Sequence, residues 1–228
     1  MIRRYDIVGI LKRVISEMII PFKVKTSVDN NDGTFTIETC NTQYLNECSI
    51  ISVNDRDYTV VSIENNTNVT LMGTPVLTED FELRPPLFIP DTPQGANNEL
   101  YKLKSDLNRY PFIWLLENFP TTYLDDGSHN VAESRVRLFF LNATQDGKWL
   151  EDEHRKFCIE PMINLCDLFL RELELKVSGK LERFVITNRI RFGNSNGENK
   201  ILDEYLSGVE LDIELPVRKW SVTCNECY

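Results

Sequence analysis

The segment from Val131 to Val217 places a long amphipathic helix between strand-like stretches, and this arrangement limits the fold more than any other feature. Apolar residues of the helix recur at the i, i+3, i+4 and i+7 spacing that puts them on one face: Ile159, Met162, Ile163, Cys166, Phe169, Leu170 and Leu173. A single apolar stripe needs a second layer of structure to cover it. The segment therefore predicts an α+β fold in which a sheet packs against the helix.

Three stretches beside the helix are the candidate strands: Arg135–Leu141 before it, and Arg183–Phe192 and Gly208–Val217 after it. In the last stretch apolar residues alternate with acidic ones, in the order Val209, Glu210, Leu211, Asp212, Ile213, Glu214 and Leu215. This period of two predicts a strand with one buried and one exposed face. The acidic side chains would face either the channel of an assembly or ordinary solvent.

A shorter amphipathic helix is predicted near the start of the chain, from Tyr5 to Ile20, and Pro21 would end it. Charged residues recur inside this stretch and no small-residue cleavage site follows, so we interpret it as a helix of the fold and not as a signal peptide. No apolar run is long enough to span a bilayer, and no membrane partner is expected. The predicted domain is a mixed or antiparallel sheet packed against both helices.

Residues 22–88 consist of short β-type runs separated by turn signals. The clearest signal is a hairpin in which the Asp32-Gly33 turn joins runs at 22–28 and 34–39. Further strands are predicted at 49–53, 58–64 and 68–72. We interpret residues 22–88 as a small β-barrel-like module inserted into the α+β domain, which would comprise residues 1–21 and 98–228.

Between these two parts the chain is rich in proline. The stretch at 84–93 contains four of the ten prolines and predicts an extended connector, with residues 89–97 as the linker. A short helix or turn is predicted over residues 98–109. The apolar run Tyr110–Leu116 that follows has the length of a strand buried on both faces.

Composition excludes some classes of function. The 228 residues carry a formal net charge of −10, which argues against ordinary binding to nucleic acid because such binding needs basic patches. Among the six cysteines only Cys224 and Cys227 have metal-ligand spacing, and a structural zinc site needs a second pair or matching histidines. The acidic cluster from Asp29 to Gly33 lacks the ligand spacing of a calcium loop and predicts a turn. No metal, cofactor or catalytic residue is predicted.

One loop raises the question of catalysis. Asp125, Asp126 and His129 lie in the polar stretch 119–130, and such residues can serve in acid–base chemistry. Adjacent carboxylates in a loop are more often solvated, and no nucleophile or second base lies at a recognisable spacing. A hydrolase that uses this loop is kept as the third functional hypothesis, and the chain is predicted not to be an enzyme.

The order of elements resembles that of a known family. The resemblance depends on five stretches: the N-terminal helix, YPFIWLL from Tyr110, VRLFFLN from Val136, HRKFCIEPMINLCDLFL from His154, and a turn at Leu206 that leads into VELDIELPV. The pattern is similar to the tail terminator, or tail completion, proteins of tailed bacteriophages and the ring proteins of the head-to-tail neck, in particular those of crAss-like phages. The resemblance covers residues 1–21 and 98–228.

This resemblance implies a structural virion protein that forms a homo-oligomeric ring, a hexamer or a dodecamer, in the head-to-tail connector. Its expected partners are copies of itself, other neck ring proteins, and portal or tail proteins. DNA would pass through the channel without specific binding, and the protein would reside in the neck or tail of the virion after assembly in the host bacterial cytoplasm. The alternative hypothesis is a non-viral soluble adaptor or protein-binding module.

Overall fold

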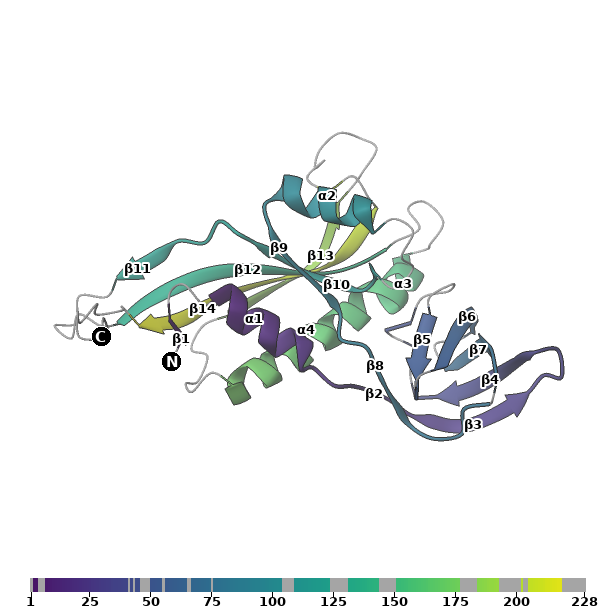
Figure 1. The fold of residues 1–228 in the computed structure, drawn as a ribbon. Helices are drawn as coiled ribbons and strands as arrows, with labels where there is room; N and C mark the ends of the chain where they lie inside the picture. Colours follow the sequence, from purple (N-terminus) through teal and green to yellow (C-terminus); the bar gives the residue numbers. More distant parts are fainter. Residues whose placement is uncertain are drawn as a thin grey trace.

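The computed structural model shows an α+β protein in which two helices cover one face of a mixed sheet and a smaller β-sheet lies beyond its end (Figure 1). The predicted α+β class is therefore confirmed. The structure describes residues 2–3, 7–40, 42, 44–45, 50–54, 56–64, 67–74, 76–103, 109–123, 131–143, 151–176, 184–192, 202 and 205–218.

The main sheet follows one path of hydrogen-bonded strands: β1 (Ile2–Arg3), β14 (Leu206–Arg218), β12 (Val131–Ala143), β10 (Phe112–Leu116) and β9 (Leu87–Asp91). Two more strands join it from the side, β11 (Thr121–Tyr123) on β12 and β13 (Phe184–Phe192) on β14. The central pairs are antiparallel, whereas β9 lies parallel to β10 and β1 parallel to β14. The sheet is therefore mixed, and the three strands predicted around the long helix all belong to it.

Helices α1 (Ile7–Ser16) and α4 (Glu160–Lys176) pack on one face of this sheet, and α2 (Pro93–Lys102) packs on the other (Figure 1). The apolar stripes predicted for α1 and α4 explain why these helices pack on the sheet. Leu11 of α1 and Phe169 of α4 are fully buried in one core with Phe140 of β12. The α2 face holds a second core with Trp114 and Phe139 stacked at 4.8 Å. Burial of apolar area on both faces stabilises the central strands.

The alternation predicted for the last strand is confirmed by its burial. Val209, Leu211, Ile213 and Leu215 are all fully buried under the two helices, and the acidic residues between them are partly exposed on the opposite face. The strand is longer than predicted at both ends, because its whole length pairs with β12 from Val131 to Ala143. Pairing with a neighbour sets the length of a strand, and the sequence pattern alone does not show it.

The long helix begins earlier than its apolar stripe. It starts as α3 (Glu151–His154), continues as a π-helical turn (Arg155–Ile159) and becomes α4 one residue before Pro161. In this turn the N–H of Glu160 donates to the carbonyl of Arg155, five residues earlier. Proline has no N–H to donate and its ring crowds the preceding turn, so a wider turn ahead of it accommodates the residue. A proline at this position allows either a helix start near Glu160 or a kink, and the structure shows a continuous helical run.

The smaller sheet is formed by β3 (Val24–Asp29), β4 (Thr34–Thr39), β7 (Asn68–Met72), β6 (Arg56–Glu64) and β5 (Ile50–Val53), in that spatial order. The predicted hairpin is confirmed, with Asn31 and Gly33 in the left-handed backbone region that a tight turn requires. The path is open, and among the described residues its end strands β3 and β5 do not pair. A two-stranded connection, β2 (Ile20–Phe22) and β8 (Phe81–Leu83), joins this sheet to the main domain.

The residues predicted as a linker, 89–97, instead contain most of β9 and the start of α2. Pro90 is tolerated in β9 because this strand is at the end of the sheet path, where a missing N–H breaks no second ladder. The helix begins early because the Thr92 hydroxyl accepts a hydrogen bond from the Gly95 N–H at 3.2 Å, with Pro93 in the first helical position. Local capping thus outweighed the loop-like composition.

Candidate binding pocket and interaction surfaces

The residues weighed for catalysis and zinc binding lie outside the described ranges. This holds for Asp125, Asp126 and His129 of the polar loop and for Cys224 and Cys227 near the end of the chain. Their arrangement therefore stays a prediction. Within the described ranges, His, Cys, Asp and Glu side chains form no group of three or more placed to hold a metal ion.

The acidic cluster from Asp29 to Gly33 forms a hairpin turn, as predicted. The Asp29 carboxylate accepts a hydrogen bond from the Asn31 N–H at 2.8 Å, and the Asp32 carboxylate accepts from the N–H of Thr34 at 2.9 Å and from its hydroxyl at 2.6 Å. These bonds from Thr34 lower the pKa of Asp32. Both carboxylates therefore stabilise the turn itself.

Two cysteines of the long helix are buried and serve the core. The Cys158 thiol donates to the carbonyl of Ser207 at 3.2 Å, which ties the π-helical turn to the start of β14. Burial, with a smaller contribution from the charge of Asp167, raises the pKa of the Cys166 thiol to about 12. Because the thiolate is the reactive form, Cys166 is expected to be inert at neutral pH.

A buried histidine was not singled out by the sequence. Nε2 of His154 lies 2.9 Å from the hydroxyl of Ser207, and both residues are almost completely buried. Enzymes with a serine nucleophile place a histidine next to that serine. The His154–Ser207 pair is buried, so neither solvent nor a substrate can reach it. Its physical role is to satisfy two buried polar groups where α3 meets β14.

The sheet face that α2 leaves open carries a ladder of cross-strand ion pairs. Arg135 of β12 binds Asp212 of β14 through two nitrogens, with Nε at 2.7 Å from the carboxylate. Arg137 lies 3.3 Å from Glu210. Two of the acidic residues considered as a channel lining are therefore matched by arginines, so this face is less negative than the acidic strand alone suggests.

The outer edge of the main sheet lies at β13. Among the described residues this strand pairs only with β14, so its other side presents backbone donors and acceptors without a sheet neighbour. Two large apolar side chains next to each other are exposed on it, Phe184 at 47% and Val185 at 61%. An edge of this kind is a natural site for pairing with another chain.

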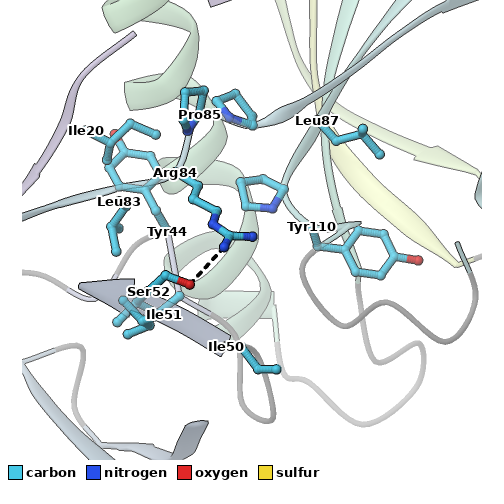
Figure 2. A pocket seen from close by; sticks show the side chains of 13 residues that line it. Ile20, Tyr44, Ile50, Ile51, Ser52, Leu83, Arg84, Pro85, Leu87 and Tyr110 are labelled. Atoms are coloured by element: carbon cyan, nitrogen blue, oxygen red, sulfur yellow. Dashed lines mark hydrogen bonds between the residues drawn. The ribbon is translucent and has the colours of Figure 1, made fainter. Parts of the chain in front are cut away.

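A pocket of about 220 Å³ lies between the smaller sheet and the main sheet (Figure 2). Its walls come from β5, the connecting strands β2 and β8, the segment that leads into β9, and the residues before β10. Most of the described residues that line it have apolar or aromatic side chains: Ile20, Tyr44, Leu45, Ile50, Ile51, Ser52, Leu83, Arg84, Pro85, Pro86, Leu87, Tyr110 and Pro111. Sequence segments that are far apart meet here because the smaller sheet lies next to one end of the main domain (Figure 1).

Among the described residues that line the pocket, Arg84 is the one with a charged side chain. The Arg84 guanidinium projects toward β5, and its Nη2 donates to the Ser52 hydroxyl at 2.8 Å (Figure 2). That hydroxyl in turn donates to the carboxylate of Asp57 at 2.5 Å. Nearby, burial and the charge of Asp167 raise the pKa of Tyr44 to about 12, so this wall stays neutral over the physiological range.

The sequence analysis did not identify Arg84, Ser52 or the two tyrosines as a group. The two tyrosines, Tyr44 and Tyr110, lie 66 positions apart along the chain, and no spacing rule connects the group. The one local signal was the run Arg84-Pro85-Pro86, where a charged residue precedes two rigid ones inside the stretch predicted as a connector. Only the packing of the smaller sheet against the main domain brings these residues together.

Comparison with known proteins assigns no family: no protein-family model, no curated protein and no solved structure matches the chain. In the described ranges, every helix is too short or too polar to cross a membrane. Function is therefore inferred from the chain's own residues and the surfaces they form.

Proposed function

We propose that the protein is a structural component of a phage virion that forms a homo-oligomeric ring in the head-to-tail connector. It would join portal-proximal components to the tail around the DNA channel. The resemblance supports this proposal, because the stretches that carry it belong to β10, β12, α4 and β14, which together bury one core. A ring component needs a stable core and complementary surfaces and requires no catalytic residue.

The observation that carries the proposal is that the main sheet ends in two unlike edges. One edge is β9, with its proline, and the other consists of the two-residue strand β1 and of β13, with exposed Phe184 and Val185. A ring repeats one contact around an axis, so each subunit needs two different patches that fit each other. Edge-to-edge contact between β13 of one subunit and the neighbouring subunit would satisfy the unpaired backbone groups and cover the apolar side chains.

The charge distribution supports passage of DNA without specific binding. The chain has 35 acidic and 25 basic residues, and the open sheet face pairs Arg135 and Arg137 with carboxylates. Phosphate binding needs arginines and lysines that are free to replace counterions. A subunit of this composition would let DNA slide through a ring and would not hold it in place.

The test is the oligomeric mass of the purified protein, alone and mixed with candidate neck, portal and tail components. We expect a hexamer or dodecamer, and we expect Val185→Lys to prevent it by placing a charge on the sheet edge. Val61→Lys is the matched control, because Val61 is 42% exposed on an inner strand of the smaller sheet. A protein that stays monomeric under every condition, including with those components, would contradict the proposal.

The pocket favours a second candidate, a non-viral soluble adaptor that binds a partner protein without forming rings. A cleft beside a small β-sheet is a common place for peptide recognition. This candidate predicts a monomer or dimer in all mixtures and a partner that binds at the pocket. Ring formation that depends on Val185 would rule it out as the main function.

A further inference from the structure

We propose that the pocket between the two sheets binds an extended segment of a partner protein, which inserts an aliphatic side chain and places a neighbouring carboxylate on Arg84. The proposal goes beyond ring formation and does not depend on it, because one subunit contains the whole pocket. It can therefore hold for a ring component or for a monomeric adaptor.

The size of the pocket selects the kind of ligand. Sites for cofactors and other small molecules usually have about 300–1,000 Å³, whereas this pocket has about 220 Å³. A nucleotide or flavin would not fit, but one or two amino-acid side chains would. Rigid rings form much of the wall, namely those of Tyr44, Pro85, Pro86, Tyr110 and Pro111. Walls of this kind lose little conformational entropy when a side chain enters.

The charge of Arg84 indicates that the peptide should carry an acidic group next to the inserted aliphatic side chain. Arg84 is exposed, and its hydrogen bond goes to the neutral hydroxyl of Ser52. Among the described residues no carboxylate forms an ion pair with it, and Asp57 is connected to it only through Ser52. A guanidinium offers a fork of N–H donors that fits a carboxylate, so Arg84 has capacity for an acidic group at the mouth of the pocket.

The surrounding strands favour an extended peptide over a free ion or a lipid. β5 is the end strand of the smaller sheet, and Ile50 on it is 38% exposed beside the pocket. A peptide can align with such an edge while its side chains enter the pocket. The apolar walls would contribute nothing to binding of a small inorganic anion, and a net charge of −10 disfavours an anionic membrane surface.

The proposal is tested by nuclear magnetic resonance titration of the full chain with capped tetrapeptides. The probe is acetyl-Gly-Leu-Glu-Gly-amide, and two comparison peptides replace its Glu by Gln or its Leu by Ala. We expect saturable shifts at pocket residues with the probe, and about tenfold weaker binding of each comparison peptide. These comparisons use the wild-type protein, so they do not depend on the folding of a variant.

Arg84→Gln should bind the probe about tenfold more weakly and should no longer distinguish Glu from Gln in the peptide. Arg56→Gln is the matched control, because Arg56 is an exposed arginine of β6 in the smaller sheet and is not among the residues that line the pocket. Equal binding of the Glu and Gln peptides by the wild type would overturn the proposal. So would equal binding of sodium acetate and the probe, or shifts confined to surfaces outside the pocket.

Discussion

Gly208 is the residue at which the smallest possible change should do the most damage to the fold. It lies on β14 opposite Leu141 of β12, and a Cβ added there would be 1.8 Å from the carbonyl oxygen of Phe140. An ordinary contact begins at 3.4 Å, and the obstacle is backbone that cannot rotate away. Because Gly208 does not have a positive φ, the requirement is for space and not for an unusual backbone conformation.

The cost of Gly208→Ala can be worked from this contact. Relieving it means separating β12 from β14 by more than an ångström, which breaks two or three ladder hydrogen bonds worth about 1 kcal/mol each. We therefore expect a loss of about 3 kcal/mol, comparable with severe overpacking of a core. At an m-value of about 3 kcal/mol per molar urea, the unfolding midpoint should fall by about 1 M.

Urea unfolding followed by tryptophan fluorescence measures this loss, since Trp114 lies in the same sheet. Gly33→Ala is the control, because Gly33 has a φ of +87° but open space around its Cβ position, in a turn of the smaller sheet. Strain at this positive φ should cost the control about 1 kcal/mol, so its midpoint should fall by only about 0.3 M and stay above that of Gly208→Ala. If Gly208→Ala leaves the midpoint unchanged, the tight approach of the two strands does not exist in solution.

Three further outcomes follow from the structure. Phe169→Ala empties a fully buried position and should cost about 3–5 kcal/mol in urea unfolding, whereas Leu175→Ala, 75% exposed on the same helix, should cost at most about 0.5 kcal/mol. Burial raises the pKa of Cys166 from 9.0 to about 12, so the unfolded chain loses this proton first and stability should fall as pH rises from about 9 to 12. Near pH 10.5 the loss is about 2 kcal/mol, and Cys166→Ala should show a shallower pH dependence; an identical slope would contradict the assignment. Arg135→Ala should cost at most about 1 kcal/mol because the Arg135–Asp212 pair is solvent-exposed on its arginine side, and the cost should shrink in high salt.

The elements of the main domain could be predicted because their apolar periodicity is strong and local. The stripe that includes Met162 and Phe169 fixed the long helix, and the alternation around Leu211 fixed the last strand. The hairpin turn at Gly33 followed from the glycine and the flanking polar residues. Each of these signals depends on neighbours a few residues away, so it can be read without knowing the rest of the structure.

The prediction failed where long-range pairing decides the structure. Residues 87–91 have the composition of a connector, yet they form β9 because the buried strand β10 offers them a parallel partner. The second core, around Trp114 and Phe139, likewise depends on α2 lying across the far face of the sheet. The start of the short helix was missed for a different reason, because its signal is local: the cap at Thr92 places the start at Pro93 and not at residue 98.

By itself, the sequence determined the α+β class, the helix stripes, the buried face of the last strand and the small sheet, because period and turn chemistry act over a few residues. The tertiary structure alone decided which strands are edges, that arginines of β12 neutralise acids of β14, and that Arg84 faces Ser52 across a pocket. These features come from contacts between residues far apart in the chain. Such contacts depend on how the layers pack, and a one-dimensional pattern does not contain that information.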